Sequence, residues 1–373
     1  MSFPIPVTVL TGFLGAGKTT LLNRLLKDPA LADTAVIINE YGDVAIDHLL
    51  VEQSSDGIIQ LSDGCLCCTV RGELVDTLAD LVDRLQTGKI GRLARIVIET
   101  TGLADPTPVL QSIMGHPALM QAFRLDGVVT LVDAVNGSAN LDAHVEALKQ
   151  AAVADRLVLT KTDLADADAV AALGERLRAI NAGARILDVQ EAGAAELLDC
   201  GLYNPSTKSA DVRRWLGEAE AHDHAHHRGR EGHNHEKHDG HDDHGHHRHH
   251  HDDRIKTHSL VHDGPVAYAA IEMFLDLLRS VHGENLLRMK GVIELKEDPS
   301  RPLVVHGVQQ LLHPPARLPA WPDGKRGTRL VLITLDMPGD YVQRLFSALT
   351  DRPAVDTPDR AALENNPLAI AGR

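Results

Sequence analysis

The sequence has few cysteines, no long apolar run and no free-standing basic cluster, and each absence excludes a class of protein. Only four of the 373 residues are cysteine, and three of these crowd together at Cys65, Cys67 and Cys68. A disulfide framework spreads its cysteines along the chain, so this crowding indicates metal or redox chemistry in a reducing compartment. The chain also lacks the run of about twenty apolar residues that a membrane-spanning helix needs.

The charge balance is acidic, with a formal net charge of −15. Because no group of lysines and arginines stands apart from acidic neighbours, the chain offers little attraction to nucleic acid or to an anionic membrane. The first apolar stretch has no basic region before it and leads directly into a glycine loop, which predicts a strand rather than an export signal. We therefore expect a cytoplasmic protein with no nucleic-acid or membrane partner.

The first half of the chain predicts an α/β fold with a mostly parallel, doubly wound sheet. Short β-branched runs alternate with amphipathic helical stretches, and several runs are apolar on both faces, as a sheet covered on both sides requires. The expected strands are Val7–Leu10, Ala35–Ile38, Ile96–Ile98, Val128–Val132, Leu157–Thr160 and Ala184–Leu187.

A histidine-rich segment divides this half from the rest. Fourteen of the 22 histidines lie between His222 and His251, where almost no apolar residue occurs, so the segment cannot bury a core. It can serve as a metal buffer, or it can be a solvated linker without that role. Later strand and helix patterns predict a smaller α+β domain. We therefore expect a P-loop domain at 1–217, a flexible linker at 218–254, the α+β domain at 255–350 and a flexible tail at 351–373.

The strongest chemical motif is a phosphate loop of the pattern GxxxxGK[ST], placed between an expected strand and a helix starting near Thr20. Its glycines allow backbone N–H groups to face the phosphates at a helix N-terminus. Lys18 would bridge the β- and γ-phosphates, and the Thr19 hydroxyl would ligate Mg²⁺. The expected nucleotide-binding residues of this loop are Gly12, Gly15, Ala16, Gly17, Lys18, Thr19 and Thr20.

A second motif is an apolar strand that ends at Glu99 and is followed by Gly102. An acid and a glycine so placed hold the Mg²⁺ shell and sense the γ-phosphate in P-loop proteins. Lys18 and Glu99 are therefore the candidate catalytic residues.

The segment Thr160-Lys161-Thr162-Asp163 follows another expected strand and resembles the NKxD guanine-recognition motif. An aspartate at the last position accepts hydrogen bonds from guanine N1 and N2, which adenine cannot supply in the same pattern. Asp163 therefore predicts GTP as the nucleotide, with Thr160 and Lys161 beside the base. Thr160 stands where asparagine is usual, so one contact to the base differs.

The cysteine cluster predicts a site for a soft cation. Thiolates at Cys65, Cys67 and Cys68 can converge on Zn²⁺ or Co²⁺, and Glu40, just after the second expected strand, is the natural fourth ligand at the same sheet edge. A dithiol redox switch and an inert buried cluster are the alternatives. The isolated Cys200 is expected to be a small buried hydrophobic residue.

Together these motifs resemble the CobW-like family of P-loop metallochaperone GTPases, in its short two-domain, zinc-associated branch. The resemblance rests on TGFLGAGKTTLL, INEYGD, GCLCC, IVIETTGLADP and TKTD, in that order, and it extends to Leu287-Arg-Met-Lys290-Gly291 and His306–Gln309. It implies that metal held by Glu40 and the cysteines communicates with the nucleotide, so that GTP hydrolysis changes metal affinity.

The leading function is therefore a GTP-hydrolysing metallochaperone that delivers a transition metal to a metal-dependent client protein. Zinc is the expected metal, with Co²⁺ or Ni²⁺ as alternatives. GTP, GDP and Mg²⁺ are the expected nucleotides and cofactor. Slow intrinsic turnover is expected because no glutamine or arginine stands out as a water-positioning group or finger. A P-loop small-molecule kinase and a metal-buffering or redox regulator with a structural nucleotide are the alternatives, and the sequence fits a monomer or a dimer.

Overall fold

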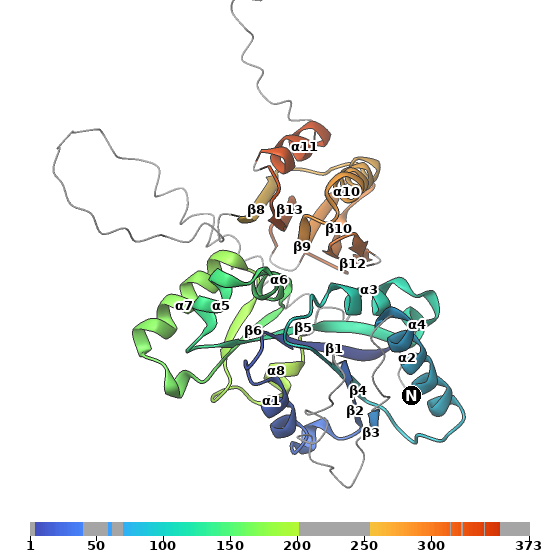
Figure 1. Cartoon of the computed structure of the whole chain (residues 1–373). Helices are drawn as coiled ribbons and strands as arrows, with labels where there is room; N and C mark the ends of the chain where they lie inside the picture. The colour runs from blue at the N-terminus through green and yellow to red at the C-terminus, as the bar shows by residue number, and fades with distance from the viewer. Residues whose placement is uncertain are drawn as a thin grey trace, which may run out of the picture.

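The computed structural model describes residues 4–39, 59–61, 70–200, 254–313, 315–321, 324–338 and 340–350. These residues form an α/β part up to Cys200 and an antiparallel sheet with two helices from Arg254 onward (Figure 1). The two parts pack against each other.

The first part is built on a seven-stranded sheet in the order β3-β2-β4-β1-β5-β6-β7, and all neighbouring strands in it are parallel. This confirms the expected α/β class. The short β3 is an addition that the sequence pattern did not predict. The strands are β1 (Ile5–Gly12), β2 (Thr34–Asn39), β3 (Ile59–Leu61), β4 (Arg95–Thr100), β5 (Phe123–Asp133), β6 (Arg156–Thr160) and β7 (Arg185–Asp188).

Helices cover both faces of this sheet. Helices α1 and α8 lie on one face, and α3, α6 and α7 lie on the face turned toward the second sheet (Figure 1). The crossovers from β1 toward β2 and from β5 toward β6 run in opposite directions, which places their helices on opposite faces. The helices are α1 (Lys18–Leu25), α2 (Val70–Gln86), α3 (Thr107–Gly115), α4 (Pro117–Ala122), α5 (Gly137–Ala143), α6 (Val145–Val153), α7 (Ala167–Ile180) and α8 (Ala194–Leu198).

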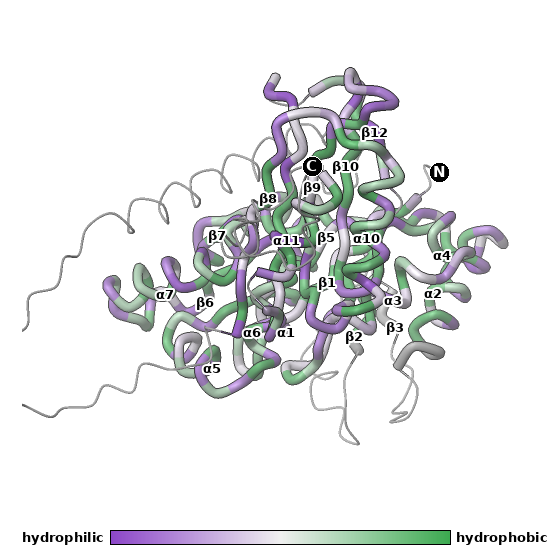
Figure 2. The backbone as a smooth tube through the Cα atoms, turned by 90° about the horizontal axis from the view of Figure 1, so that it is seen from above, coloured by the Kyte–Doolittle hydropathy of each residue, from purple (hydrophilic) through white to green (hydrophobic). Residues whose placement is uncertain are grey.

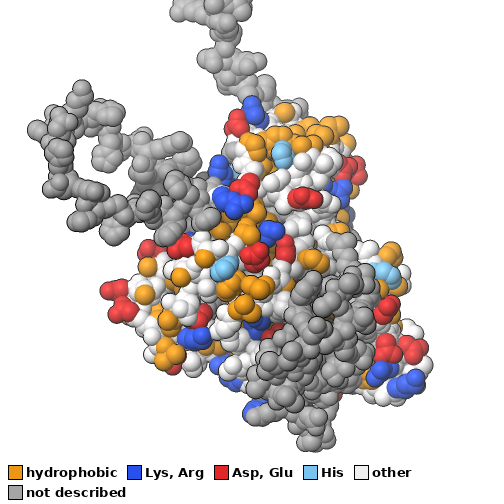
Figure 3. Space-filling model, viewed as in Figure 1, with side chains coloured by type: hydrophobic (Ala, Val, Ile, Leu, Met, Phe, Trp, Pro, Cys, Tyr) orange, Lys and Arg blue, Asp and Glu red, His pale blue; other side chains and the backbone are white. Residues whose placement is uncertain are grey.

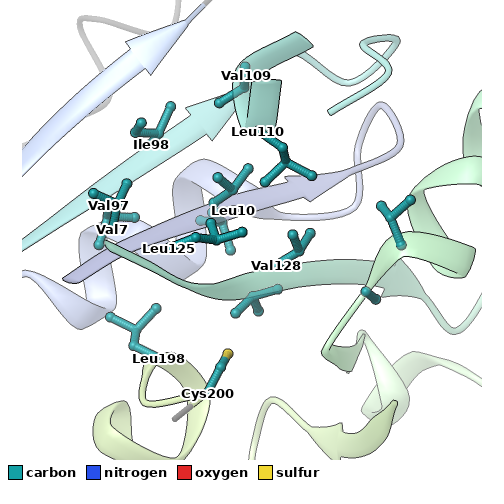
Figure 4. Close-up of a cluster of buried hydrophobic side chains, with 14 of the residues drawn as sticks. Val7, Leu10, Val97, Ile98, Val109, Leu110, Leu125, Val128, Leu198 and Cys200 are labelled. Carbon is teal, nitrogen blue, oxygen red and sulfur yellow. The ribbon is translucent and has the colours of Figure 1, made fainter. Parts of the chain in front are cut away.

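The core of this part lies along the central strands, which are hydrophobic through most of their length (Figure 2). Val7 and Leu10 of β1 lie beside Ile98 of β4 and Leu125 of β5 (Figure 4). Cys200 borders this cluster and is 6% exposed, which confirms the expected buried cysteine. Burial raises the pKa of its thiol, so it is protonated at neutral pH.

The second part is an antiparallel sheet in the order β11-β10-β9-β13-β8, with β12 paired to β10. Helices α10 and α11 pack together, with Phe274 and Phe346 edge to face at 5.6 Å. The expected α+β class is confirmed, and β9 begins five residues before the predicted Gly291. The elements are β8 (Ile255–His262), α10 (Tyr268–His282), β9 (Leu286–Leu295), β10 (Asp298–Val308), β11 (Leu311–Leu312), β12 (Ala316–Arg317), β13 (Thr328–Leu335) and α11 (Tyr341–Leu349).

The outer side of the second part carries exposed apolar side chains. Hydrophobic side chains gather over α10 and α11 (Figure 3). Met273, Leu277 and Val281 of α10 are 54%, 38% and 58% exposed, and their spacing of four residues places them on one helix face. The outer face of α10 therefore keeps an apolar stripe.

The other face of the second sheet packs on the first part. Helix α6 contacts β9, α7 contacts β8 and α3 contacts β11. The two parts share one buried apolar cluster, to which the second sheet contributes Ile255, Leu287, Val308, Ile333 and Leu335. The interface is thus a continuous hydrophobic core.

A buried cluster of charged side chains joins the two parts at this interface. Asp155, the residue before β6, pairs through Oδ1 with Arg288 and, at 3.0 Å, with the Lys290 ammonium, both from β9. Its Oδ2 accepts the backbone N–H of Val128 at 2.9 Å. Burial alone would raise the pKa of Asp155, but the two cations and the Val128 hydrogen bond outweigh it and hold the pKa below its usual value. Asp155 is therefore a carboxylate shared between the two parts.

The predicted linker and tail fall on segments 218–253 and 351–373, which lie outside the described residues, as does the histidine tract. The boundaries at 217, 254 and 350 therefore stay predictions. Among the residues that are described, no helix combines the length and the hydrophobicity needed to cross a membrane.

Candidate nucleotide-binding site

The turn after β1 has the backbone geometry of a phosphate cradle. Gly15 and Gly17 have φ angles of 73° and 90°, the left-handed region that favours glycine. Helix α1 begins directly afterwards at Lys18, two residues earlier than predicted. The N–H groups of its first turn have no partner within the helix, so an anion can bind there.

Lys18 and Gly12 complete this turn. The Lys18 ammonium donates to the carbonyls of Gly12 at 3.0 Å and Phe13 at 3.4 Å, and only 9% of the residue is exposed. A β-carbon on Gly12 would lie 2.5 Å from the carbonyl oxygen of Leu131, so β1 and β5 approach too closely for any other residue. The lysine is thus held over the loop that would carry the phosphates.

Two more residues of the predicted loop differ in their exposure to solvent. Ala16 is buried and donates its N–H to the Phe13 carbonyl at 3.1 Å, whereas Thr20 is exposed on α1. The Phe13 ring stacks on His144 at 4.5 Å between centroids. The sequence analysis gave His144 no role, and a histidine between two short helices carries no signal that would have found it.

Thr19 and Glu99 meet beside the loop. The Thr19 hydroxyl donates to Glu99 Oε1 at 3.1 Å, and Glu99 is 5% exposed at the end of β4. A hydroxyl and a carboxylate at this distance supply the hard oxygen atoms that Mg²⁺ prefers. The residues present therefore fit the expected magnesium ion, while the ligating role of each stays a prediction.

The loop after β4 lies against the phosphate loop. A β-carbon on Gly102 would lie 2.8 Å from the Cα of Leu14. Two α6 residues hold the other side of this loop. Gln150 donates to the Gly102 carbonyl at 3.2 Å, and the Lys149 ammonium pairs with Asp105 at 3.1 Å. The sequence analysis missed both residues, although a glutamine inside an apolar helical stretch is itself a sign of a buried hydrogen bond.

The predicted base-recognition segment ends at the same sheet edge. Thr160 is the last residue of β6, and its hydroxyl donates to the Ala16 carbonyl at 2.9 Å. The threonine thus joins this segment to the phosphate loop. Asp163 lies exposed in a short 3-10 turn, Thr162–Leu164, where its carboxylate is accessible to a base.

Lys161, between these two residues, has a φ of 56° and pairs with Asp133 at 2.7 Å. Burial would raise the pKa of Asp133, but hydrogen bonds from Lys161 and Asn136 lower it overall. Asp133 therefore fixes a lysine in the left-handed conformation next to the predicted base pocket, a role the sequence analysis did not assign.

The predicted metal ligands Glu40, Cys65, Cys67 and Cys68 lie outside the described residues. Within the described ranges, no group of three or more histidine, cysteine, aspartate or glutamate residues is placed to hold a metal. The described strand β2 ends at Asn39, which pairs with Thr100 in the parallel ladder. Glu40 therefore follows in sequence a strand end that lies beside Glu99.

Comparison with known proteins agrees with this geometry. Residues 6–188 match the model of the CobW/HypB/UreG nucleotide-binding domain, and residues 255–350 match the cobalamin synthesis protein cobW C-terminal domain. These ranges fall on the two parts of the structure.

Relatives and solved structures cover nearly the whole chain. The zinc chaperone YjiA of Escherichia coli is 35% identical over 347 residues, covering 93% of this chain and 99% of its own. The zinc chaperone CobW of a Sinorhizobium species is 32% identical, with coverage of 92% and 97%. The crystal structure of Zn(II)-bound YjiA GTPase superposes with a TM-score of 0.67 at 30% identity, over 94% of this chain and 99% of that one.

A Zn(II)-bound triple mutant of YjiA, with one glutamate and two cysteines replaced by alanine, gives the same TM-score of 0.67 and 30% identity, over 93% of this chain and 99% of that one. The identity and coverage of these full-length relatives, together with the two matched domain models, are decisive for the family. The chain belongs to the CobW/HypB/UreG family.

Proposed function

We propose that this chain is a GTP-hydrolysing metallochaperone that binds a transition metal, with zinc as its cargo, and delivers it to a metal-dependent client protein. The observation that carries the proposal is the contact between Thr19 and Glu99 at 3.1 Å beside a phosphate loop that Thr160 ties to the base-recognition segment. Relatives that match nearly the whole chain are named zinc chaperones, which supports zinc as the cargo.

In this proposal the chain's own residues divide the work on GTP. Lys18 neutralises charge on the β- and γ-phosphates, and Thr19 with Glu99 would hold Mg²⁺, which supplies positive charge to the phosphates when bound. Asp163 selects guanine through its carboxylate. The full set of proposed nucleotide-binding residues is Gly12, Gly15, Ala16, Gly17, Lys18, Thr19, Thr20, Glu99, Thr160, Lys161 and Asp163.

The cargo is proposed to bind at Glu40, Cys65, Cys67 and Cys68. In sequence, Glu40 follows β2, and the cysteines lie between β3 and α2. A change in this loop region on loss of the γ-phosphate would lower the metal affinity. A hundredfold change requires only about 2.7 kcal/mol of coupling between the two sites. We also propose a cytoplasmic location.

The deciding experiment is a competition titration of Zn²⁺, Co²⁺ and Ni²⁺ against a chromophoric chelator, with a non-hydrolysable GTP analogue and then with GDP, each with Mg²⁺. A chain lacking residues 222–251 removes the background from the histidine tract. We expect about hundredfold weaker binding of the physiological metal with GDP, and no such difference after Cys65, Cys67 and Cys68 are changed to serine.

Nucleotide dependence, rather than bound zinc alone, must be the readout. A relative carrying alanine in place of one glutamate and two cysteines still crystallised with Zn(II), so zinc retention by itself decides nothing. Identical affinity with both nucleotides in the unaltered chain would rule out the coupled metallochaperone and favour a metal buffer. A phosphorylated small-molecule product would instead favour the kinase alternative.

Guanine selection has a separate test. In Asp163→Asn the carboxylate that accepts from guanine N1 and N2 is replaced by an amide, which can instead donate to the C2 carbonyl of xanthine. We expect GTP affinity to fall at least about tenfold and xanthosine triphosphate to bind better than in the unaltered chain. Unchanged preference for GTP would remove Asp163 from the base site.

A further inference from the structure

Gln150 is a buried amide whose side-chain nitrogen bonds to the loop after β4. It lies on α6, is 1% exposed, and its Nε2 donates to the carbonyls of Gly102 at 3.2 Å and Ala104 at 3.0 Å. Its own backbone carbonyl accepts the Thr130 hydroxyl of β5 at 2.8 Å. Both donors of the amide are thus used to fix the loop that follows Glu99.

A second tie lies one residue earlier on the same helix. The Lys149 ammonium pairs with Asp105 at 3.1 Å, and Asp105 in turn accepts the N–H and hydroxyl of Thr107 at 2.9 and 2.6 Å. On its opposite side, this loop presses Gly102 against Leu14 of the phosphate loop. The loop is therefore clamped between the phosphate cradle and α6.

Helix α6 also reaches the second domain. It begins after His144, which stacks on Phe13 of the phosphate loop, and it ends two residues before Asp155, which holds Arg288 and Lys290 of β9. The helix itself packs against β9. One short rigid element thus connects the phosphate loop, the loop after β4 and the C-terminal domain.

We infer that Gln150 is a positioning residue for GTP hydrolysis, which sets the loop Gly102–Asp105 at the γ-phosphate and links that loop to the C-terminal domain through α6. The inference rests on the proposed placement of the γ-phosphate beside Gly102. Because two of its carbonyls are already bonded, the loop is ordered before the reaction starts. Losing these bonds should therefore lower kcat more than it weakens nucleotide binding.

The test replaces Gln150 with leucine and compares it with a matched buried amide. Asn181 donates to the carbonyls of Ala151, Ala152 and Ala154 at 2.9 to 3.0 Å, so these bonds tie the C-terminal end of the same helix and do not go to the loop. We expect Gln150→Leu to lower kcat for GTP about a hundredfold with KM changed less than about threefold. Asn181→Leu should leave kcat within about threefold despite a comparable loss of stability.

Amide hydrogen exchange of residues 101–107 provides a readout independent of turnover. In the nucleotide-free protein, Gln150→Leu should speed exchange of these amides about tenfold or more, and Asn181→Leu should not. Equal effects of both substitutions on kcat, or unchanged exchange in Gln150→Leu, would overturn the inference. An unaltered chain that fails to hydrolyse GTP would instead count against the proposed function, because the exchange result does not depend on turnover.

Discussion

The polar residues at the two ends of β6 differ in their surroundings. At the carboxyl end, Thr160 is bonded to the phosphate loop, and Asp163 stands exposed in the turn beyond it. At the amino end, Asp155 and Arg156 are 7% and 6% exposed, and Asp155 is enclosed by Arg288 and Lys290 of the other domain. One five-residue strand therefore separates a site that is open to a ligand from a site that is closed by protein.

This difference follows from what each end must do. Polar groups that await a ligand keep an open side, since water satisfies them until the ligand arrives. Polar groups in a domain interface have no water, so they must find protein partners or destabilise the fold. Helix α6 ends two residues before Asp155, and it also packs against β1, the strand that leads into the phosphate loop.

The largest effect should be on stability, from a substitution at the amino end of β6, which we call the closed end because protein encloses it. Asp155→Ala leaves Arg288 and Lys290 buried without their carboxylate, and we expect the free energy of unfolding to fall by about 3–5 kcal/mol. Urea denaturation measures this. The control is Asp340→Ala, which breaks an exposed ion pair with Arg344 and should cost at most about 1 kcal/mol.

A triple variant separates charge from packing at this position. With Asp155→Asn, Arg288→Met and Lys290→Met combined, the amide still accepts the Val128 N–H and none of the three charges remains. Stability should return to within about 1–2 kcal/mol of the unaltered chain. A triple variant as unstable as Asp155→Ala would mean that shape, rather than charge compensation, holds the domains together.

At the sheet edge that carries the phosphate loop and the carboxyl end of β6, the open end, the largest effect should come from Gly102→Ala. The new β-carbon would meet the backbone of Leu14 at 2.8 Å, so the loop beside the γ-phosphate must move. Displacement of a reacting group by about 1 Å can lower turnover about a hundredfold, and we expect a loss of that order in GTP hydrolysis. Gly91→Ala, where nothing lies within 4 Å, should leave turnover unchanged.

Acid should destabilise the folded chain through Asp155, at the amino end of β6. The pKa of Asp155 is lowered in the folded chain, so its stabilising contribution is complete above the unfolded pKa of about 3.9 and is lost as pH falls through the folded value. Below pH 4 the free energy of unfolding should fall by up to about 1.4 kcal/mol per pH unit more steeply than in the triple variant. Parallel curves for the two proteins would show that Asp155 does not titrate in this range.

The open end could be predicted from the sequence much better than the closed end. The phosphate loop, Glu99 and the TKxD segment are local motifs, each written within a few neighbouring residues, and the strand order brings them to one edge. Gln150 bonds a carbonyl 48 residues away, and Asp155 pairs with Arg288, which is 133 residues away. No local pattern predicts such pairings, because they depend on how α6 packs against the loop after β4 and on how β9 docks on the first part.

The bounds of elements show the same division. The central strands β1 and β4 were found because apolar residues run through them, whereas β5 begins five residues before the predicted Val128. In β9 the first five residues include Arg288 and Lys290, and these charges hid the start of the strand from an analysis based on hydrophobicity. Their burial becomes understandable only with Asp155 beside them.

The smallest effect concerns the residue that departs from the usual guanine motif. Thr160→Val keeps the branched shape but removes the hydroxyl that donates to the Ala16 carbonyl, so it should cost about 1 kcal/mol of stability. Because that bond joins the base segment to the phosphate loop, GTP affinity should fall about two- to fivefold as well. Thr257→Val breaks a longer bond, 3.4 Å to the Ile180 carbonyl, at the domain interface. If Thr257→Val weakened GTP binding as much as Thr160→Val, the nucleotide site and the domain interface would not be energetically separate.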